Sequence, residues 1–597
     1  MNSKEKIEAL RSLMKKHGVE AYLISGSDPH QNEYVPVFWQ RRKFVSGFTG
    51  SAGDIVITQN SAGLWTDSRY FLQAEQQLDP EVFMLFKSGL PGIPTIKDWL
   101  LTQLKSGDNM GIDPRVITHH TFGEFKAEFD KREIHIQNIP ENLVDRIWEN
   151  RPAPPSEPVQ ILDKRYTGES VASKLGRLRK IMEKDATDAY IITKLDSIAW
   201  LFNIRGSDVR YNPIVISYAV VKKERTVLFI DRSKLGDGPI DILKTDIEIR
   251  NYGQFEEELK NLAEGGRRIW LDQNSVSQWI VDSLEKKCDL LFKAEPILML
   301  KAIKNATEIE GMRNAHIRDG AAMVKFLSWL DRRLHKEDIT EVSAAVKLTE
   351  FRAENDLFQG PSFETISSYA AHGAIVHYAP TPKTDVSLAA EGIYLVDSGG
   401  QYRDGTTDIT RTLALGEPTE EQKDRFTRIL QGVIRLTTVS FPKGTVGKQL
   451  DALARTALWD VGENYLHGTG HGIGHYLNVH EGPQSLSHHR CTNVALQPGM
   501  IQSIEPAVYK EGEYGMRIEN VVLTINNDEL SSEGNEFYTF ETLTLCPIDI
   551  RLIDPSMLSQ DEIDWLNRYH KQVNDTISPQ LNEEERAWLT IATQPID

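Results

Sequence analysis

Residues 392–416 read GIYLVDSGGQYRDGTTDITRTLALG, which places two β-rich runs on either side of a glycine-rich turn. This pattern is typical of a β-hairpin with a fairly long loop. Asp397 ends the first run and Asp408 opens the second, so a carboxylate abuts each apolar strand. Taken alone, aspartates at strand ends usually serve turns. The hairpin therefore becomes informative only together with the residues that follow it.

Two further acids lie inside strand-like apolar runs. Glu505 occurs in MIQSIEPAVY and Glu519 in MRIENVVLT. An ionised carboxylate leaves water at a high cost unless it finds a partner, so each needs an arginine, a metal ion or a proton. Arg517 lies two residues before Glu519, on the same face of the predicted strand. A buried arginine–glutamate pair is therefore the alternative to a ligand role for Glu519.

Histidines are concentrated in residues 466–483, which read LHGTGHGIGHYLNVHEGP. The glycines between them allow the backbone to approach a ligand closely. The spacing is not HExxH, which excludes a zincin, and no cysteine pair accompanies it, which excludes a structural zinc site. His377, in AIVHYAPT, follows an apolar strand and by itself resembles a core histidine. The cluster contains His467, His471, His475 and His480.

The acids and one histidine together form a ligand set of mostly oxygen atoms, which favours manganese before zinc. Four carboxylates are balanced by two divalent ions, whereas one ion would leave a net negative charge in a low-dielectric pocket. Two ions roughly 3.5–4 Å apart can hold one hydroxide between them and polarise a carbonyl. The set predicts hydrolysis of an amide or ester. Its acids are Asp397, Asp408, Glu505 and Glu519.

Composition limits the partners and the compartment. The 597 residues carry 68 Lys and Arg against 86 Asp and Glu, a net charge of −18, which argues against nucleic acid and anionic membranes. Three distant cysteines, Cys288, Cys491 and Cys546, imply no disulfide framework and favour a reducing compartment. No secretory signal or run of ~20 apolar residues occurs. We expect a cytoplasmic enzyme.

A proline-rich linker and an internal repeat divide the chain. Residues 150–160 read NRPAPPSEPVQ, which favours an extended spacer. Residues 10–24, LRSLMKKHGVEAYLI, match residues 178–192, LRKIMEKDATDAYII, without a gap. We therefore predict two copies of one α/β domain. The predicted domains are residues 1–155, 156–302 and 303–597, the last with a helical tail.

Periodicity predicts the elements of the third domain. A long amphipathic helix should follow Thr307, with Thr307 as N-cap and Glu310 completing a capping box. Two further helices are expected over 419–440 and 446–461, and polar amphipathic helices over 556–589.

The ordered ligand set resembles that of the pita-bread metallopeptidases, which include methionine aminopeptidase, prolidase and aminopeptidase P. GTGHGIG with LNVHEGP, SFETISSYAAHGAIVHYAPT and the early HQNEYVPVFWQRRKFVSGFTGSAG look like the long X-prolyl aminopeptidases. The resemblance spans almost the whole chain. It implies an α/β (α+β) fold class with two creatinase-N-like domains before a pita-bread catalytic domain. It also implies removal of the N-terminal residue from Xaa-Pro-Yaa peptides through a metal-bridged hydroxide.

The resemblance assigns ligands to two divalent ions, for which manganese is expected and zinc or cobalt are the alternatives. Asp397 would bind one ion, and His471 with Glu505 would bind the other. Asp408 and Glu519 would bridge the two.

The resemblance also assigns the catalytic groups. His377, His467 and His480 would position the substrate, donate to the tetrahedral intermediate and shuttle protons, while Glu505 would act as general base. His377 and His480 would line the rim of a proline pocket. His475 matches a position where the family does not require histidine, so it is left out.

Several readings remain beside the main one. The family implies a homodimer through the catalytic domain, and we expect the C-terminal helices to take part. A prolidase restricted to Xaa-Pro dipeptides would share the five ligands. A creatinase-like amidinohydrolase or a non-catalytic peptide- or histone-binding module would have lost ligands that this chain keeps.

Overall fold

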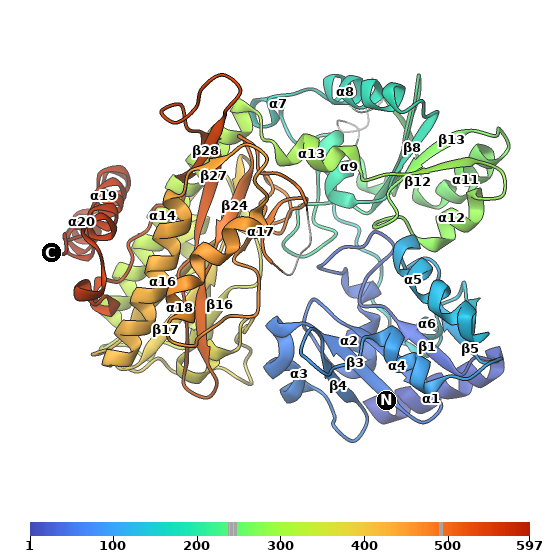
Figure 1. Ribbon diagram of the computed structural model, residues 1–597, viewed down its shortest axis with the longest axis horizontal. Coiled ribbons are helices and arrows are strands. Elements are labelled where there is room, and N and C mark those ends of the chain that lie inside the picture. Colours follow the sequence, from blue (N-terminus) through green and yellow to red (C-terminus); the bar gives the residue numbers. More distant parts are fainter. Residues whose placement is uncertain (237, 239–242, 244–246, 489–492) are drawn as a thin grey trace. The chain divides into compact units, whose positions relative to one another are not determined.

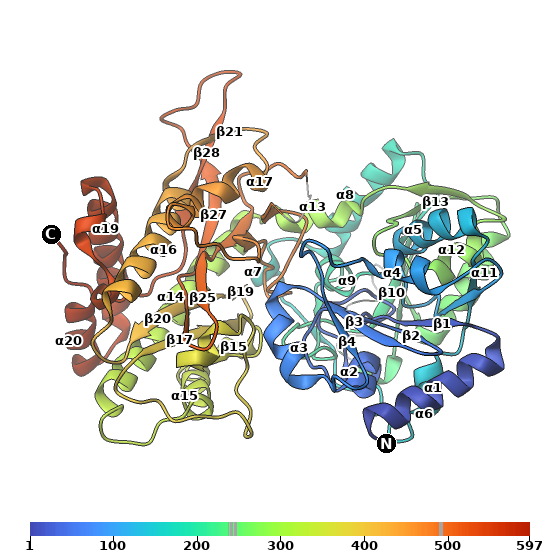
Figure 2. The same ribbon diagram turned by 60° about the horizontal axis from the view of Figure 1, so that its bottom comes forward.

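The computed structural model describes residues 1–236, 238, 243, 247–488 and 493–597, so Cys491 lies outside it. The chain divides into two compact units (Figures 1 and 2). The first comprises Met1–Leu162 and Glu169–Ile297, and the second Asp163–Gly168 and Leu298–Asp597. Both mix helices with sheets, which confirms the α/β (α+β) class. The domain limits at residues 155 and 302 stay predictions.

The first unit contains two sheets of identical topology, β4-β3-β2-β1-β5-β6 and β12-β11-β10-β8-β13-β14. In each, the central strand is antiparallel to one neighbour and parallel to the other. The predicted similarity of the two domains is confirmed. The strands of the first sheet are β1 (Ala21–Ile24), β2 (Asp54–Thr58), β3 (Ala62–Thr66), β4 (Met84–Lys87), β5 (Asn109–Ile112) and β6 (His135–Asn138). Those of the second are β8 (Ala189–Ile192), β10 (Ser217–Lys222), β11 (Thr226–Ile230), β12 (Glu248–Asn251), β13 (Arg268–Leu271) and β14 (Asp289–Phe292).

A helix precedes the central strand of each sheet, as the repeat predicts. α1 (Ser3–His17) begins at a capping box between Asn2 and Glu5 and ends at Gly18, whose φ of 65° favours glycine. α8 (Val171–Lys184) begins at the N-cap Ser170. Both helices bury one apolar stripe at helical spacing, made of Ile7, Leu10 and Met14 in α1 and of Leu175, Leu178 and Met182 in α8.

One buried histidine joins the two repeats of the first unit. His30 Nδ1 lies 2.8 Å from the carbonyl of Thr193, and Nε2 lies 2.9 Å from the Tyr252 hydroxyl. Burial lowers the pKa of His30 to about 4, so its ring is neutral at physiological pH. The start of the HQNEY motif therefore has a structural task in holding the repeats together.

The second unit is built around α14 (Ala306–Arg333), which the long amphipathic segment predicts. The predicted N-cap at Thr307 is wrong, since the helix begins two residues earlier. The side chain of Asn305 accepts from the Glu308 N–H at 3.0 Å, and the Glu308 carboxylate accepts from the Asn305 N–H at 3.0 Å. An N-cap residue is the one whose side chain accepts a hydrogen bond from the backbone N–H near the start of the helix, and here that residue is Asn305.

Two more predicted helices can be compared with the structure. α16 (Glu420–Thr438) is confirmed. The continuous helix over 446–461 is wrong, since the segment forms α17 (Gly447–Leu450), the 3₁₀ turn η7 (Asp451–Ala454) and α18 (Thr456–Trp459). Tertiary contacts decide this, because the Ala454 carbonyl packs directly on Gly432 of α16. α15 (Glu341–Ala353) packs beside α14.

The predicted hairpin is confirmed. β17 (Ile393–Ser398) pairs antiparallel with β20 (Ile409–Ala414), so that Asp397 lies opposite Thr410. The loop between them forms a second short hairpin of β18 (Gly400–Tyr402) and β19 (Gly405–Thr406). β16 (Ile366–Tyr369) completes this sheet. The other strands that reach the site are β22 (Gly470–His471), β24 (Ile501–Ile504), β25 (Ala507–Lys510), β26 (Tyr514–Arg517) and β27 (Asn520–Asn526).

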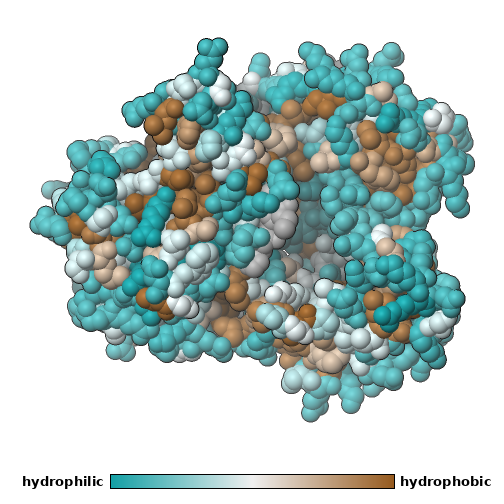
Figure 3. Space-filling model, viewed as in Figure 1, coloured by the Kyte–Doolittle hydropathy of each residue, from teal (hydrophilic) through white to brown (hydrophobic). Residues whose placement is uncertain are grey.

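The predicted C-terminal helices are α19 (Gln560–Ile577) and α20 (Glu583–Ala592), which pack on α14 (Figure 1). Their apolar residues lie in the same core as those of α16. The face in Figure 3 is mostly hydrophilic, with small scattered apolar patches. In the part of the chain that the structure describes, no helix has the length and apolar character that crossing a bilayer requires.

A buried arginine ties the C-terminal helices to the central strands. Arg411 of β20 is 1% exposed and donates to the carbonyls of Glu519 and Cys546 at 2.8 Å and to the Tyr569 hydroxyl at 2.9 Å. Tyr569 belongs to α19, so one guanidinium connects β20, the start of β27 and the tail.

Arg411→Met should lower the free energy of unfolding of the second unit by about 3 kcal/mol, because several buried carbonyls lose their donor. Arg551→Met is the matched control, since Arg551 is half exposed and pairs with the nearby Asp549; a change within about 0.5 kcal/mol is expected there. Calorimetric unfolding compares the two. Equal transition temperatures would contradict the role of Arg411.

Candidate metal centre

Strand ends deliver the five predicted ligands to one region of the second unit. Asp397 lies in β17 and Asp408 directly precedes β20, while His471 ends β22. Glu505 follows β24, and its N–H donates to the Thr469 carbonyl at 2.7 Å. Glu519 lies between β26 and β27, and its N–H donates to the Thr410 carbonyl at 3.1 Å. Strand pairing and these backbone hydrogen bonds therefore fix Asp397, Glu505 and Glu519 near the ends of strands.

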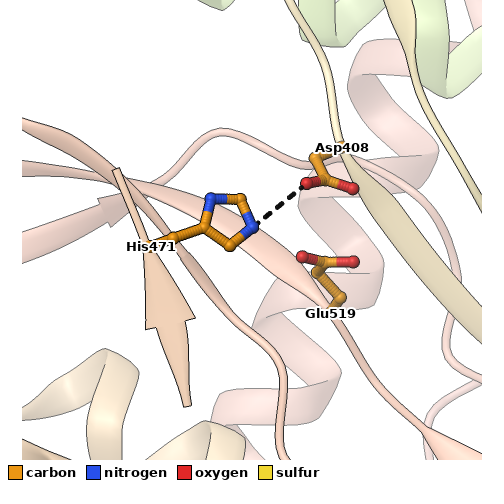
Figure 4. A group of neighbouring side chains, drawn as sticks. All are labelled: Asp408, His471 and Glu519. Carbon is orange, nitrogen blue, oxygen red and sulfur yellow. Dashed lines mark ion pairs between the residues drawn. The ribbon is translucent and has the colours of Figure 1, made fainter. Parts of the chain in front are cut away.

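One imidazole faces the carboxylates (Figure 4). His471 Nε2 lies 3.5 Å from Asp408 Oδ2, the ion pair drawn as a dashed line. It also lies 3.8 Å from Glu505 Oε1. Ligand atoms of Asp408, His471 and Glu519 all lie within 4.8 Å of one another. His471 Nδ1 lies 3.0 Å from the Gly472 carbonyl, which favours a proton on Nδ1 and leaves Nε2 as the ligand atom.

Arg517 supplies the positive charge of this cluster, and its ion-pair partner is Asp397. The guanidinium donates to Asp397 Oδ2, to the Thr410 hydroxyl at 3.0 Å and to the Tyr509 hydroxyl at 2.6 Å. Thr410 in turn donates to Glu519 Oε2 at 2.8 Å. Instead of the direct Arg517–Glu519 ion pair considered from the sequence, the Thr410 hydroxyl connects the two side chains.

The carboxylates of this cluster lack enough neighbouring positive charge to ionise together. Burial raises the pKa of Asp408 well above its usual range, and the neighbouring Glu519, Asp397 and Glu505 raise it further. Burial, Asp397 and Glu505 likewise raise the pKa of Glu519 far above its usual range. Carboxylates this close cannot all ionise unless cations join them. Without cations, the centre would have to hold protons.

The residues present fit two divalent ions. Asp397 Oδ1 is buried and accepts no hydrogen bond from the described residues, although its other oxygen is bonded to Arg517. A buried carboxylate oxygen in this state suits a cation. Oxygen donors with a single imidazole suit hard or borderline metals such as manganese.

The histidines predicted to be catalytic differ in how the structure places them. The His480 ring lies edge-on to that of His471, with centroids 4.3 Å apart. His467 Nε2 lies 2.9 Å from the Tyr509 hydroxyl, which links it to Arg517. His377 is half buried and follows the 3₁₀ turn η6 (Ala370–Ala374), which packs on β26.

The omitted histidine lies elsewhere. His475 is 3% exposed and packs against α14, where a Cβ on Gly311 would lie 3.1 Å from its Nε2.

A buried ion cluster holds the residue next to His480. Glu481 Oε2 lies 3.0 Å from Lys301 Nζ, and Oε1 lies 2.5 Å from Lys304 Nζ, with all three side chains 1% exposed. Lys301 belongs to α13 (Pro296–Ala302), which enters the second unit. Two lysines near the start of this part of the second unit therefore hold the Glu481 carboxylate in place.

Sequence reasoning missed Thr410 and Tyr509. Alternation along β20 puts Thr410 on the face of Asp408, so period two could have indicated it. Tyr509 reaches Arg517 across the β25–β26 pair, whose register no local pattern reveals.

Comparisons with known proteins agree with this architecture. A Creatinase/Prolidase N-terminal domain matches residues 6–144 and again 150–308. Metallopeptidase family M24 matches residues 310–526, and the C-terminal region of M24 peptidases matches 536–596.

Individual relatives extend over the full chain. Xaa-Pro aminopeptidase 1 of Dictyostelium discoideum is 41% identical over 99% of this chain and 96% of its own. The X-prolyl aminopeptidase of Caenorhabditis elegans, described as a cytosolic enzyme with a di-nuclear active site, is 37% identical over all of both chains with a TM-score of 0.96. A Bacillus anthracis Xaa-Pro dipeptidase covers 64% of this chain and 99% of its own, with a TM-score of 0.51 at 24% identity, and shows the fold alone.

Two creatinase-type domains before an M24 domain that brings Asp408, His471 and Glu519 together define a pita-bread metallopeptidase. The chain belongs to the three-domain Xaa-Pro aminopeptidase (aminopeptidase P) family within that class. The predicted fold and family are thus confirmed, while the individual residue roles stay predictions.

The raised carboxyl pKa values predict how the chelated protein responds to pH. Folded-state pKa values above the unfolded ones stabilise the metal-free protein below about pH 4, and that stability is lost as pH rises through the raised values. Metal-free Asp408→Asn should therefore unfold at a higher temperature than metal-free wild type at pH 8, with a smaller difference at pH 5. Manganese should reverse the order, because wild type binds it more tightly.

The exposed Asp460→Asn is the control and should follow wild type at both pH values. Identical pH dependence in Asp408→Asn and wild type would show that Asp408 carries no excess proton.

Proposed function

We propose that this chain is a metal-dependent aminopeptidase that removes the first residue from peptides with proline at the second position. One observation carries the proposal, namely a cluster of Asp408, His471 and Glu519 with metal-ligand spacing in a chain that matches Xaa-Pro aminopeptidases from end to end. Peptides with penultimate proline are its substrates, with proline nitrogen as the leaving atom.

Five side chains hold two divalent ions in this proposal, manganese before zinc or cobalt. Asp397, whose Oδ1 is buried without a hydrogen bond from the described residues, would hold one ion, and His471 with Glu505 would hold the other. Asp408 and Glu519 would contribute to both, which fits their burial and their strongly raised pKa values. When bound, the ions polarise the scissile carbonyl and lower the pKa of the attacking water.

The chain's own groups handle the protons. Glu505 is the general base, and its side chain is 19% exposed against 5% for Asp408, so it can reach a water molecule. His377, His467 and His480 position the peptide, stabilise the developing oxyanion and return a proton to the leaving nitrogen.

Proline specificity follows from the chemistry of the bond. An Xaa-Pro bond is a tertiary amide without an N–H, and its ring fixes φ near −65°. A site that selects it replaces the missing backbone hydrogen bond with apolar packing and preorganised imidazoles. His377 and His480 form the rim of that pocket in the proposal.

We further propose a cytoplasmic homodimer formed through the catalytic unit. The unpaired thiols of Cys288 and Cys546 suit a reducing compartment. Trp459 is 50% exposed and Leu466 45% exposed, on the segment leading to His467. Since the apolar face of α19 is buried within its own core, this pair is a better candidate for the interface than α19.

Peptide assays test the function. Chelated enzyme restored with manganese should release the first residue from Xaa-Pro-Yaa tripeptides and leave Xaa-Pro dipeptides intact. Turnover confined to dipeptides would identify a prolidase. Asp408→Ala should lose more than the roughly 10–100-fold activity that an outer-shell partner costs, with circular dichroism unchanged; a wild-type rate would contradict the bridging role.

Sedimentation velocity tests the homodimer. Wild type should sediment as a dimer and Trp459→Ser as a monomer, because the substitution removes the exposed indole. Ile591→Ser is the matched control, since Ile591 is 62% exposed on α20, and should leave the dimer intact. A dimeric Trp459→Ser protein would exclude this interface.

A further inference from the structure

A buried carboxylate lies under the loop that carries His377. Glu341 is the first residue of α15, and its side chain is fully buried. Its backbone carbonyl also accepts from the Ser367 hydroxyl at 2.7 Å, so α15 is fastened to β16 at this point. The loop between β16 and Tyr378 lies directly above the carboxylate.

Donors from the end of β16 and from the loop that follows it surround the carboxylate. Oε1 accepts from the Tyr369 N–H at 2.7 Å and lies 2.9 Å from His372 Nδ1, while Oε2 accepts from the Tyr378 hydroxyl at 2.7 Å. Among the described residues, no lysine or arginine forms an ion pair with Glu341. Burial raises the pKa of Tyr378, so its hydroxyl remains a donor at any working pH.

The same loop has a second anchor at its apex. A Cβ on Gly373 would lie 2.7 Å from the Gly515 nitrogen, and one on Gly515 only 1.8 Å from the Gly373 carbonyl. Gly515 belongs to β26, the strand that carries Arg517. His377, immediately before Tyr378, is therefore attached to a segment fixed on α15 at both ends and on β26 in between.

Neutral hydrogen-bonding groups in place of the Glu341 carboxylate would be enough to anchor this loop. Burying a charge is costly, and neutral groups can anchor a loop. Charge-assisted hydrogen bonds are shorter and roughly twice as strong as neutral ones. They suit a catalytic group, which must be held within about 0.5 Å of its working position.

We propose that Glu341 is a positioning residue for catalysis, holding His377 in place through Tyr378, Tyr369 and His372. The inference rests on the proposed function, because the role of His377 toward the peptide belongs to that proposal. Glu341 itself touches neither substrate nor metal ion in this scheme.

The test removes one hydroxyl and leaves the fold intact. Tyr378→Phe should lower kcat on an Xaa-Pro-Yaa tripeptide about tenfold while KM stays within about twofold, since misplacing a catalytic group acts on the transition state. Tyr538→Phe is the matched control, because Tyr538 belongs to β28 (Phe537–Thr542) and its ring packs edge-on against Phe441, and it should keep the wild-type rate. Manganese content should be unchanged in both.

A double-mutant cycle separates positioning from general stability. In a His377→Ala background, Tyr378→Phe should have no further effect on kcat, because the group that it positions is absent. An additive loss, or wild-type kcat in Tyr378→Phe, would overturn the inference. Wild-type enzyme is measured beside each variant, so an inactive wild type bears on the proposed function, whereas these differences bear on Glu341.

Discussion

Mutual repulsion of buried carboxylates is the constraint on which the catalytic unit depends. Asp397, Asp408, Glu505 and Glu519 converge where water is largely excluded, and Arg517 is the arginine bonded within the group. Holding such a cluster together without cations requires a rigid frame. Backbone pairing of the strands that end there provides this frame, and the ions that the set fits would turn its cost into binding energy.

Polar groups behind the ligands reinforce this frame. Thr410 connects Arg517 to Glu519, and Arg411, one residue on, points the opposite way toward the C-terminal tail. Thr410 and Arg411 are adjacent on β20, and they serve different parts of the unit. Thr410 bonds to residues of the candidate metal centre, and Arg411 bonds to the C-terminal region. This arrangement gives the C-terminal region a structural reason to accompany the M24 domain.

Features that depend on short stretches of sequence could be predicted, whereas contacts between distant segments could not. Apolar runs around a glycine-rich turn revealed the hairpin, isolated acids in apolar runs revealed the carboxylates, and the match of residues 10–24 to 178–192 revealed the repeated domains, because those signals can be seen in short stretches of sequence. The pairing of Arg517 with Asp397 could not be foreseen, since it depends on which strands lie side by side. The helix expected over 446–461 failed for the same reason, because Ala454 packs on Gly432. Glu341, an ordinary acid at a helix start, carried no sequence signal at all.

The cluster of Lys301, Lys304 and Glu481 has a practical consequence for dissecting the molecule. The predicted domain limit at residue 302 falls between the two lysines, so a catalytic fragment cut there would discard one ammonium group. A carboxylate adjoining His480 would then keep a single counter-ion in an environment that tolerates little imbalance. Expression of the M24 domain without Lys301 would therefore change the ionic contacts beside His480. The helix α13, which carries Lys301, is better assigned to the catalytic unit.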